Sequence, residues 1–200
     1  MLSTIIERLN DRRDAAGDAG EDAGFTLIEL MVVLLILAIL LAIAIPTFLG
    51  VTGGANDRAA QSNLNTALTT AKGAGTENGQ SYNTTGGGSS NITVGDLQNN
   101  EPSITFATGS VAGTGRVSVY ISADGNGVVL ADMSKATNTC WYAMDNLNNV
   151  TDTTGPYAGG APTTPGTFYN HAKPASGSAV CDASDGSGTT FPTGTWPNHF

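Results

Sequence analysis

The feature that most constrains this chain is an apolar stretch over residues 25–49, which carries a single charged side chain, Glu29. As an α-helix the stretch would be roughly 37 Å long, enough to cross the ~30 Å hydrocarbon core of a bilayer. A carboxylate inside such a stretch costs about 2.5 to 3.5 kcal/mol near the bilayer centre even on a lenient scale. We therefore predict a membrane helix in which Glu29 requires a partner.

Two ordinary explanations of this stretch account for only part of it. A secretory signal peptide would be cut after the small residues at 42–44, but its apolar segment is normally about 7 to 15 residues long and carries no acid. A plain single-pass anchor explains the length of the stretch but neither Glu29 nor Gly24.

The sequence GFTLIEL at residues 24–30 resembles the class III signal of bacterial type IV pilins and the related type II secretion pseudopilins. The resemblance implies that a membrane-embedded prepilin peptidase cuts between Gly24 and Phe25 and methylates the new amine of Phe25. It places Glu29 at the acidic fifth position of the mature chain, and Pro46 at the proline that kinks the helix in this family.

Cutting before Phe25 would create an ammonium group about one helical turn from Glu29. At about 4 Å and an effective dielectric near 20, such a pair attracts by roughly 4 kcal/mol before desolvation is subtracted. The amine can belong to the same chain or to the next copy in a helical bundle, and the resemblance favours the neighbouring copy. Phe25 and Glu29 are thus the predicted assembly residues.

Residues 1–24 form the predicted leader, and their charges set the orientation of the chain. Arg8, Arg12 and Arg13 place the leader in the cytoplasm, because orientation follows Lys and Arg near the membrane. The rest of the chain would then face outward. Removal of the leader leaves 11 acidic and 5 basic side chains, a balance that disfavours intrinsic binding to nucleic acid.

Beyond the membrane stretch, the sequence predicts a bent and interrupted stem. Pro46 removes a backbone donor and predicts a kink. Three glycines within 50–54 predict that the helix unwinds just beyond it. Apolar residues recur at helical spacing over 60–71, so we predict an amphipathic helix over 50–72 that ends at Gly73 and packs on a sheet.

The next segments predict an α+β head with an antiparallel sheet over 103–145, reached through a connecting loop at 73–102. Alternation and β-branched residues predict strands at 103–107, 116–122, 128–133 and 140–144. The sequence DGNG at 124–127 is a strong hairpin signal. A calcium loop is the alternative reading of that turn, although the further spaced carboxylates of a full site are missing.

Cys140 and Cys181 are the only cysteines, and an even number in an exported head predicts a disulfide. It would close residues 146–200, which are rich in Thr, Gly and Pro and poor in core residues, back onto the sheet. The resembled pilins also carry such a disulfide-closed C-terminal region. Zinc binding by the cysteines with His171 and His199 is the alternative, although no close pair of ligands exists.

No catalytic grouping stands out, so we expect neither an enzyme nor a cofactor. The resemblance implies a structural subunit, the major pilin of a type IV pilus, used for adhesion, motility or surface interaction. Its partners would be other copies of itself, the prepilin peptidase, the pilus assembly machinery and, before assembly, the cytoplasmic membrane. The alternatives are a pseudopilin of a type II secretion or DNA-uptake system, and a minor pilin or tip adhesin.

Overall fold

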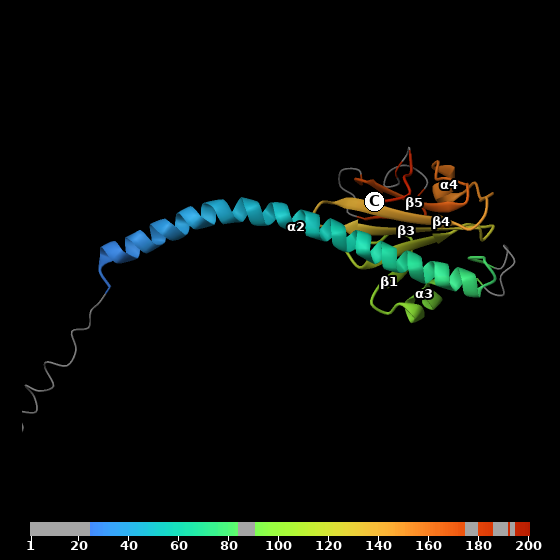
Figure 1. Cartoon of the computed structure of the whole chain (residues 1–200), viewed down its shortest axis with the longest axis horizontal. Coiled ribbons are helices and arrows are strands. Elements are labelled where there is room, and N and C mark those ends of the chain that lie inside the picture. The colour runs from blue at the N-terminus through green and yellow to red at the C-terminus, as the bar shows by residue number, and fades with distance from the viewer. Residues whose placement is uncertain (1–24, 84–90, 175–179, 186–191, 193–194) are drawn as a thin grey trace, which may run out of the picture. The chain divides into compact units, whose positions relative to one another are not determined.

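The computed structural model describes residues 25–83, 91–174, 180–185, 192 and 195–200 (Figure 1). Contacts within the chain divide it into two units, Met1–Phe48 and Leu49–Phe200. A long apolar helix and a five-stranded sheet confirm the predicted α+β class. The helices are α2 (Leu27–Glu77), α3 (Val94–Asn100) and α4 (Gly155–Ala158). The strands are β1 (Thr105–Thr108), β2 (Arg116–Ile121), β3 (Gly127–Ser134), β4 (Thr139–Asn146) and β5 (Gly166–Ala172).

Helix α2 is continuous from Leu27 to Glu77, so the predicted unwinding within 50–54 is wrong. Two side chains bond backbone carbonyls along this part of the helix: Thr47 Oγ1 donates to Ile43 O at 2.8 Å, and Asn56 Nδ2 donates to Thr52 O at 2.8 Å. Each added helical residue also contributes a backbone hydrogen bond, which offsets the glycine cost of about 1 kcal/mol per residue. Pro46 lies inside α2, and its kink stays a prediction.

The end of α2 also differs from the prediction, because the helix passes Gly73 and Gly75 before it ends at Glu77. Gly75 is a packing glycine: a Cβ atom there would lie 2.8 Å from Cε1 of Tyr82. Tyr82 is fully buried, and its hydroxyl donates to Asp145 Oδ2 at 2.7 Å. The absent side chain at Gly75 therefore lets this ring lie against the helix.

Alanine at these two glycines is expected to change stability in opposite directions. Gly73→Ala should raise the free energy of unfolding by up to about 1 kcal/mol, because a methyl group there meets no described atom within 4 Å. Gly75→Ala should lower it by about 1 to 2 kcal/mol, because the clash with Tyr82 exceeds the gain in helix propensity. Denaturant unfolding of the two variants checks this, and two shifts of the same sign would contradict it.

The sheet has the order β1-β2-β3-β4-β5, so strands adjacent in the sequence are adjacent in space. Strands β2 to β5 are antiparallel, but β1 runs parallel to β2, with Thr105 opposite Arg116. The prediction of a wholly antiparallel sheet is therefore wrong at this edge. The connecting residues 109–115 leave the sheet, and Val111 forms a bridge with Cys181 through bonds of 2.7 and 2.8 Å. Glycines with positive φ at 109, 113 and 115 permit this detour.

Strand β5 lies within residues 146–200, whose composition is poor in core residues, and it includes His171. It pairs with β4 from Cys140 opposite Ala172 to Asn146 opposite Gly166. The backbone groups of β5 find their hydrogen-bond partners on the edge of β4. The composition of residues 146–200 gives no sign of this pairing. The predicted sheet boundary at 145 is therefore too early.

Helix α3 also lies where the sequence predicts a connecting loop, within 73–102. Thr93 caps it: Thr93 Oγ1 accepts from Asp96 N at 3.2 Å, and Thr93 N donates to Asp96 Oδ2 at 2.8 Å. This reciprocal pair is a capping box. The fully buried Leu97 holds the short helix against the core.

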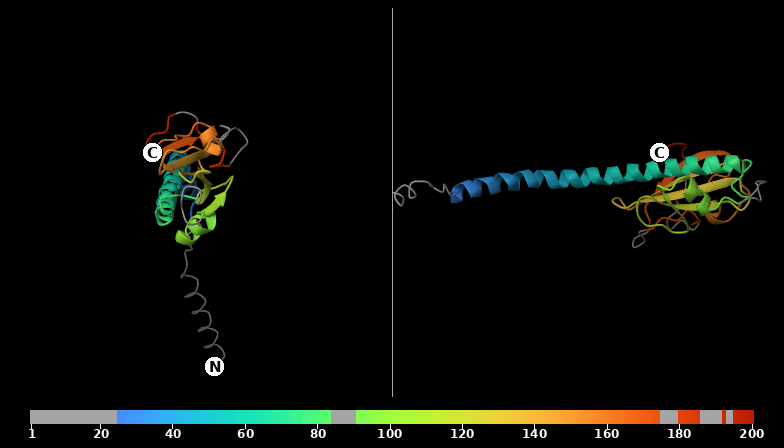
Figure 2. Two further views of the ribbon diagram at one scale, coloured as in Figure 1. Left: turned by 90° about the vertical axis from the view of Figure 1, so that its right-hand side faces the viewer. Right: turned by 90° about the horizontal axis from the view of Figure 1, so that it is seen from below.

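Both faces of the sheet are buried, each by a different part of the second unit. The half of α2 in this unit lies along one face (Figure 2), where Leu64 and Leu68 join a cluster with Leu130. The predicted packing of the amphipathic stripe on the sheet is thus confirmed. The opposite face, with Val129 and Tyr142, is covered by residues that follow β4. Neighbouring residues of β3, such as Val129 and Leu130, point to opposite faces of the sheet because the side chains of a strand alternate with a period of two residues.

The β2–β3 hairpin forms as predicted, with Ile121 opposite Val128. Asp124 organises its turn: Oδ1 accepts from Ser122 Oγ at 2.7 Å, and Oδ2 accepts from Thr151 Oγ1 at 2.9 Å. Burial raises the pKa of Asp124, but these and other hydrogen bonds outweigh it and lower the pKa to about 2. Both carboxylate oxygens thus face donors in the protein, which does not favour the calcium reading of this turn.

Candidate functional site

The first part of α2 exposes an unbroken apolar surface. Phe25 is 89% exposed, and the large apolar side chains from Leu27 to Val51 that the structure describes are also exposed. By length and composition α2 qualifies as a membrane-crossing helix. An exposed apolar surface of this extent marks contact with lipid or with other proteins.

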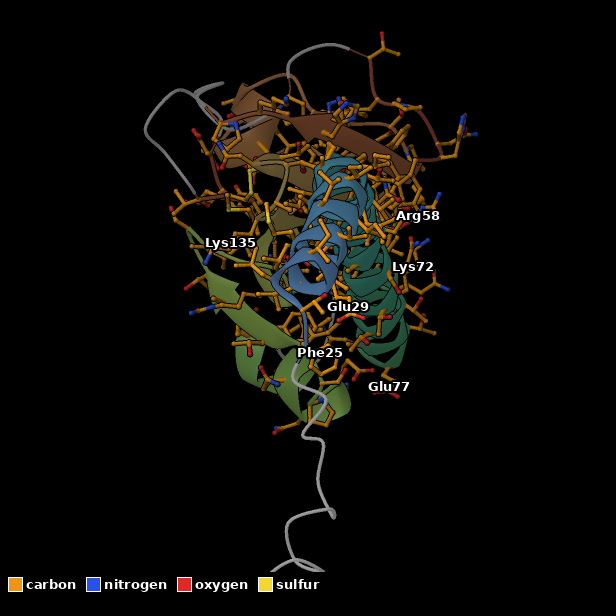
Figure 3. All side chains as sticks on the ribbon, turned by 90° about the vertical axis from the view of Figure 1, so that its left-hand side faces the viewer. Phe25, Glu29, Arg58, Lys72, Glu77 and Lys135 are labelled. Atoms are coloured by element: carbon orange, nitrogen blue, oxygen red, sulfur yellow. A yellow bond between two sulfur atoms is a disulfide. The ribbon has the colours of Figure 1, made fainter. Side chains whose placement is uncertain are left out.

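Glu29 lies in the first turn of α2, next to the exposed Phe25 (Figure 3). Its Oε2 accepts hydrogen bonds from Thr26 N and Thr26 Oγ1, each at 2.9 Å. In return, Glu29 N donates to Thr26 Oγ1 at 3.3 Å. These reciprocal bonds form a capping box, which satisfies backbone donors that the first turn of a helix otherwise leaves open. Glu29 therefore fixes where α2 begins.

The capping geometry leaves Glu29 able to take a second partner. Both bonds from Thr26 end on Oε2, and within the described part of the chain the other carboxylate oxygen accepts no hydrogen bond, so it can accept from an ammonium group. This cap is not among the features predicted above, although the spacing Thr26-x-x-Glu29 is its known signature. Gly24, the residue before the predicted cut, lies outside the described residues. The cut and the methylation of Phe25 remain predictions.

The predicted disulfide is confirmed in the second unit. Cys140 and Cys181 are joined with a Cα–Cα distance of 5.5 Å, and both residues are fully buried. The bond links β4 to the segment that pairs with Val111. Among the described residues no group of three or more His, Cys, Asp or Glu side chains is placed to hold a metal ion.

Polar contacts fix the second half of α2 on the sheet at both ends. Lys72 Nζ lies 2.9 Å from Asp145 Oδ1 and donates to Thr167 Oγ1 at 2.6 Å. Nearer the start of this half, Asp57 Oδ1 accepts from Thr137 Oγ1 at 2.5 Å and from Trp141 Nε1 at 3.4 Å. The helix is thus held in register along the sheet by directional bonds as well as by its apolar stripe.

Between these two anchors lies a buried carboxylate, Asp132 on β3. Its Oδ2 accepts from Asn63 Nδ2 of α2 at 3.0 Å and from Gly115 N at 3.3 Å, and its Oδ1 accepts from Met133 N at 2.7 Å. Burial raises the pKa of Asp132 to about 6, although these hydrogen bonds act in the opposite direction. The side chain therefore takes up a proton in mildly acidic solution.

Replacing Asp132 by Asn is expected to remove a contribution that stabilises the fold as the pH falls from 7 to 4. The unfolded carboxyl has a pKa of about 3.9, so between that value and about 6 the folded chain holds a proton that the unfolded chain has lost. Relative to Asp132→Asn, the parent should therefore gain about 2 kcal/mol of stability as the pH falls from 7 to 4. Denaturant unfolding at several pH values checks this, and parallel curves for parent and Asp132→Asn would contradict it.

Comparison with known proteins identifies one motif in the chain. The family model of the prokaryotic N-terminal methylation motif matches residues 21–45. The match spans the predicted cut, the capped first turn and most of the exposed apolar part of α2. No curated protein and no solved structure matches the chain.

Proposed function

This chain carries the N-terminal methylation motif of the type IV pilin and pseudopilin family, and from this premise we propose that it is the major subunit of a type IV pilus. Membership of this family points to a structural, non-enzymatic protein. The proposed sequence of events is removal of residues 1–24, methylation of Phe25 and assembly into a filament.

The observation that carries the proposal is the exposed apolar part of α2 directly after the motif. In a membrane this surface contacts lipid, and in a filament it would contact the same surface of neighbouring copies. Lipid tails are as apolar as the side chains, so helix association in a membrane needs packing or polar contacts besides apolar burial. The freed amine of Phe25 and the second oxygen of Glu29 would supply such a contact.

The second unit supports a head that lies outside the cytoplasm, as the proposed major pilin requires. Its sheet is covered on both faces, its two cysteines form a disulfide, and oxidising compartments are where such bonds persist. The proposed location is the cytoplasmic membrane before assembly, with the N-terminus inside, and the cell-surface filament afterwards. The proposed partners are other copies of the chain, the prepilin peptidase and the pilus assembly machinery.

Electron microscopy of sheared cell-surface material, combined with N-terminal sequencing, tests the proposal. We expect abundant filaments whose subunits begin at methylated Phe25. Short envelope-bound filaments would favour a pseudopilin. A low copy number, with filaments of normal length in the absence of this chain, would favour a minor pilin. A native chain that begins at Met1 and occurs in no polymer would refute all three.

A further inference from the structure

Residues 195–200 wrap around the outer edge of β5, and we refer to them as the edge clasp. Trp196 is buried, and its ring lies 6.3 Å from that of Tyr142. Phe200 lies 5.6 Å from the ring of Trp141 and 4.4 Å from that of Tyr169. Neighbouring residues of a strand point to opposite faces of the sheet. Because Trp141 and Tyr142 are neighbours on β4, the clasp reaches one face with Trp196 and the other with Phe200.

The clasp also occupies backbone and side-chain groups along this edge. Tyr169 N donates to Pro197 O at 2.7 Å, and Asn170 Nδ2 donates to Thr195 O at 3.3 Å. His171 N donates to the side-chain Oδ1 of Asn170 at 2.8 Å. Two successive outward-facing donors of β5 are thus bonded within the same chain.

The opposite edge of the sheet is covered by a different element. Strand β1 is the outer strand there, and Phe106 N donates to Gln98 Oε1 of α3 at 3.0 Å. An open strand edge is a template for pairing with another chain, and natural proteins cover such edges. In the described part of the chain, each edge of this sheet therefore has its own cover, α3 at β1 and the short segment 195–200 at β5.

We propose that the edge clasp prevents the β5 strands of two copies of this chain from pairing edge to edge. Without the clasp, the β5 strands of two copies could pair antiparallel about a twofold axis, because two identical strands paired in this way offer each other the same donors and acceptors. The clasp is built to be removable: Thr195, Pro197 and His199 are exposed, and a single buried side chain, Trp196, anchors it. This role goes beyond assembly through α2 and does not require the chain to form a pilus.

The test uses the full mature chain in detergent micelles and a variant that releases the clasp, Trp196→Ala with Phe200→Ala. Amide hydrogen exchange at Tyr169 should become at least about tenfold faster, because its acceptor on Pro197 is withdrawn. The variant should also self-associate at concentrations at which the parent does not, as measured by sedimentation in density-matched detergent. Asn198→Ala, on the same exposed segment, is the matched control and should behave as the parent.

A rescue variant separates edge pairing from association through α2. His171→Lys in the released chain places a charge beside the open edge and should restore the parental sedimentation. Fast exchange at Tyr169 without self-association would overturn the proposal, as would unchanged exchange. If the double substitution unfolds the whole sheet, fast amide exchange in the central strand β3 will reveal it. In that case Phe200→Ala alone replaces it as the test of the proposal, because this variant keeps the buried Trp196. That variant must show faster Tyr169 exchange and increased self-association, or the proposal fails.

Discussion

Chains with Glu29→Ala are expected to enter the membrane and to form no filaments, where the parent forms them in abundance. A pair between Glu29 and the freed amine of Phe25 would be worth roughly 4 kcal/mol before desolvation. Even half of this value, about 2 kcal/mol, would weaken each addition of a subunit roughly thirtyfold. Filaments counted by electron microscopy, with the membrane-bound pool measured by immunoblot, give the result.

Two matched variants separate the charge of Glu29 from its capping role. Glu29→Gln keeps an acceptor for the Thr26 donors, since Gln also completes a capping box, but it removes the charge. Thr26→Ala keeps the charge and removes the cap, at a cost of about 1 kcal/mol. We expect Glu29→Gln to fail in assembly and Thr26→Ala to assemble. If Glu29→Gln assembles and Thr26→Ala does not, Glu29 contributes to assembly through helix capping alone. Abundant filaments from Glu29→Ala would show that assembly needs neither the charge nor the cap of Glu29.

Removal of the disulfide by Cys140→Ala with Cys181→Ala is expected to lower the free energy of unfolding by about 4 kcal/mol. The bond closes a loop with a sequence separation of 41, and the chain-entropy model assigns a value of this size to such a loop. The bonded cysteines also lie in the apolar cluster of one sheet face, so packing is lost together with the crosslink. Denaturant unfolding and timed proteolysis measure the loss.

The parent chain treated with a reductant is the control for this variant. Reduction removes the crosslink but keeps both sulfur atoms, so it should cost slightly less stability than the double alanine variant. Membrane insertion should be the same in all samples, because the apolar part of α2 is unchanged. Protease resistance equal to that of the oxidised parent would show that the crosslink contributes little to the head.

Local sequence patterns predicted the elements that depend on local interactions. The apolar stripe of α2 has helical spacing, β2 and β3 alternate, and the turn at 124–127 has the residues that a hairpin requires. The disulfide followed from the even number of cysteines in a head that was predicted to be exported. Two capping boxes, at Thr26 and Thr93, were also readable from local spacing but were missed.

The errors concern features that other parts of the chain determine. Strand β5 forms because the edge of β4 offers it partners, and its own Gly- and Thr-rich surroundings do not indicate a strand. The parallel pairing of β1 with β2 requires a connection that leaves the sheet, and this connection pairs through Val111 with the distant Cys181. The helix passes its predicted end at Gly73, and nothing in the neighbourhood of Gly75 reveals that Tyr82 will pack on it. Long-range contacts override local preference in all three cases.

The sequential strand order has a consequence for how the head matures. Since β2, β3 and β4 pair with their neighbours along the chain, they can form hairpin by hairpin as the polypeptide is synthesised. Cys140 emerges before β5, and its thiol has no partner until Cys181 follows. Oxidation is thus timed to come last, when the strands that align the two sulfur atoms have already emerged.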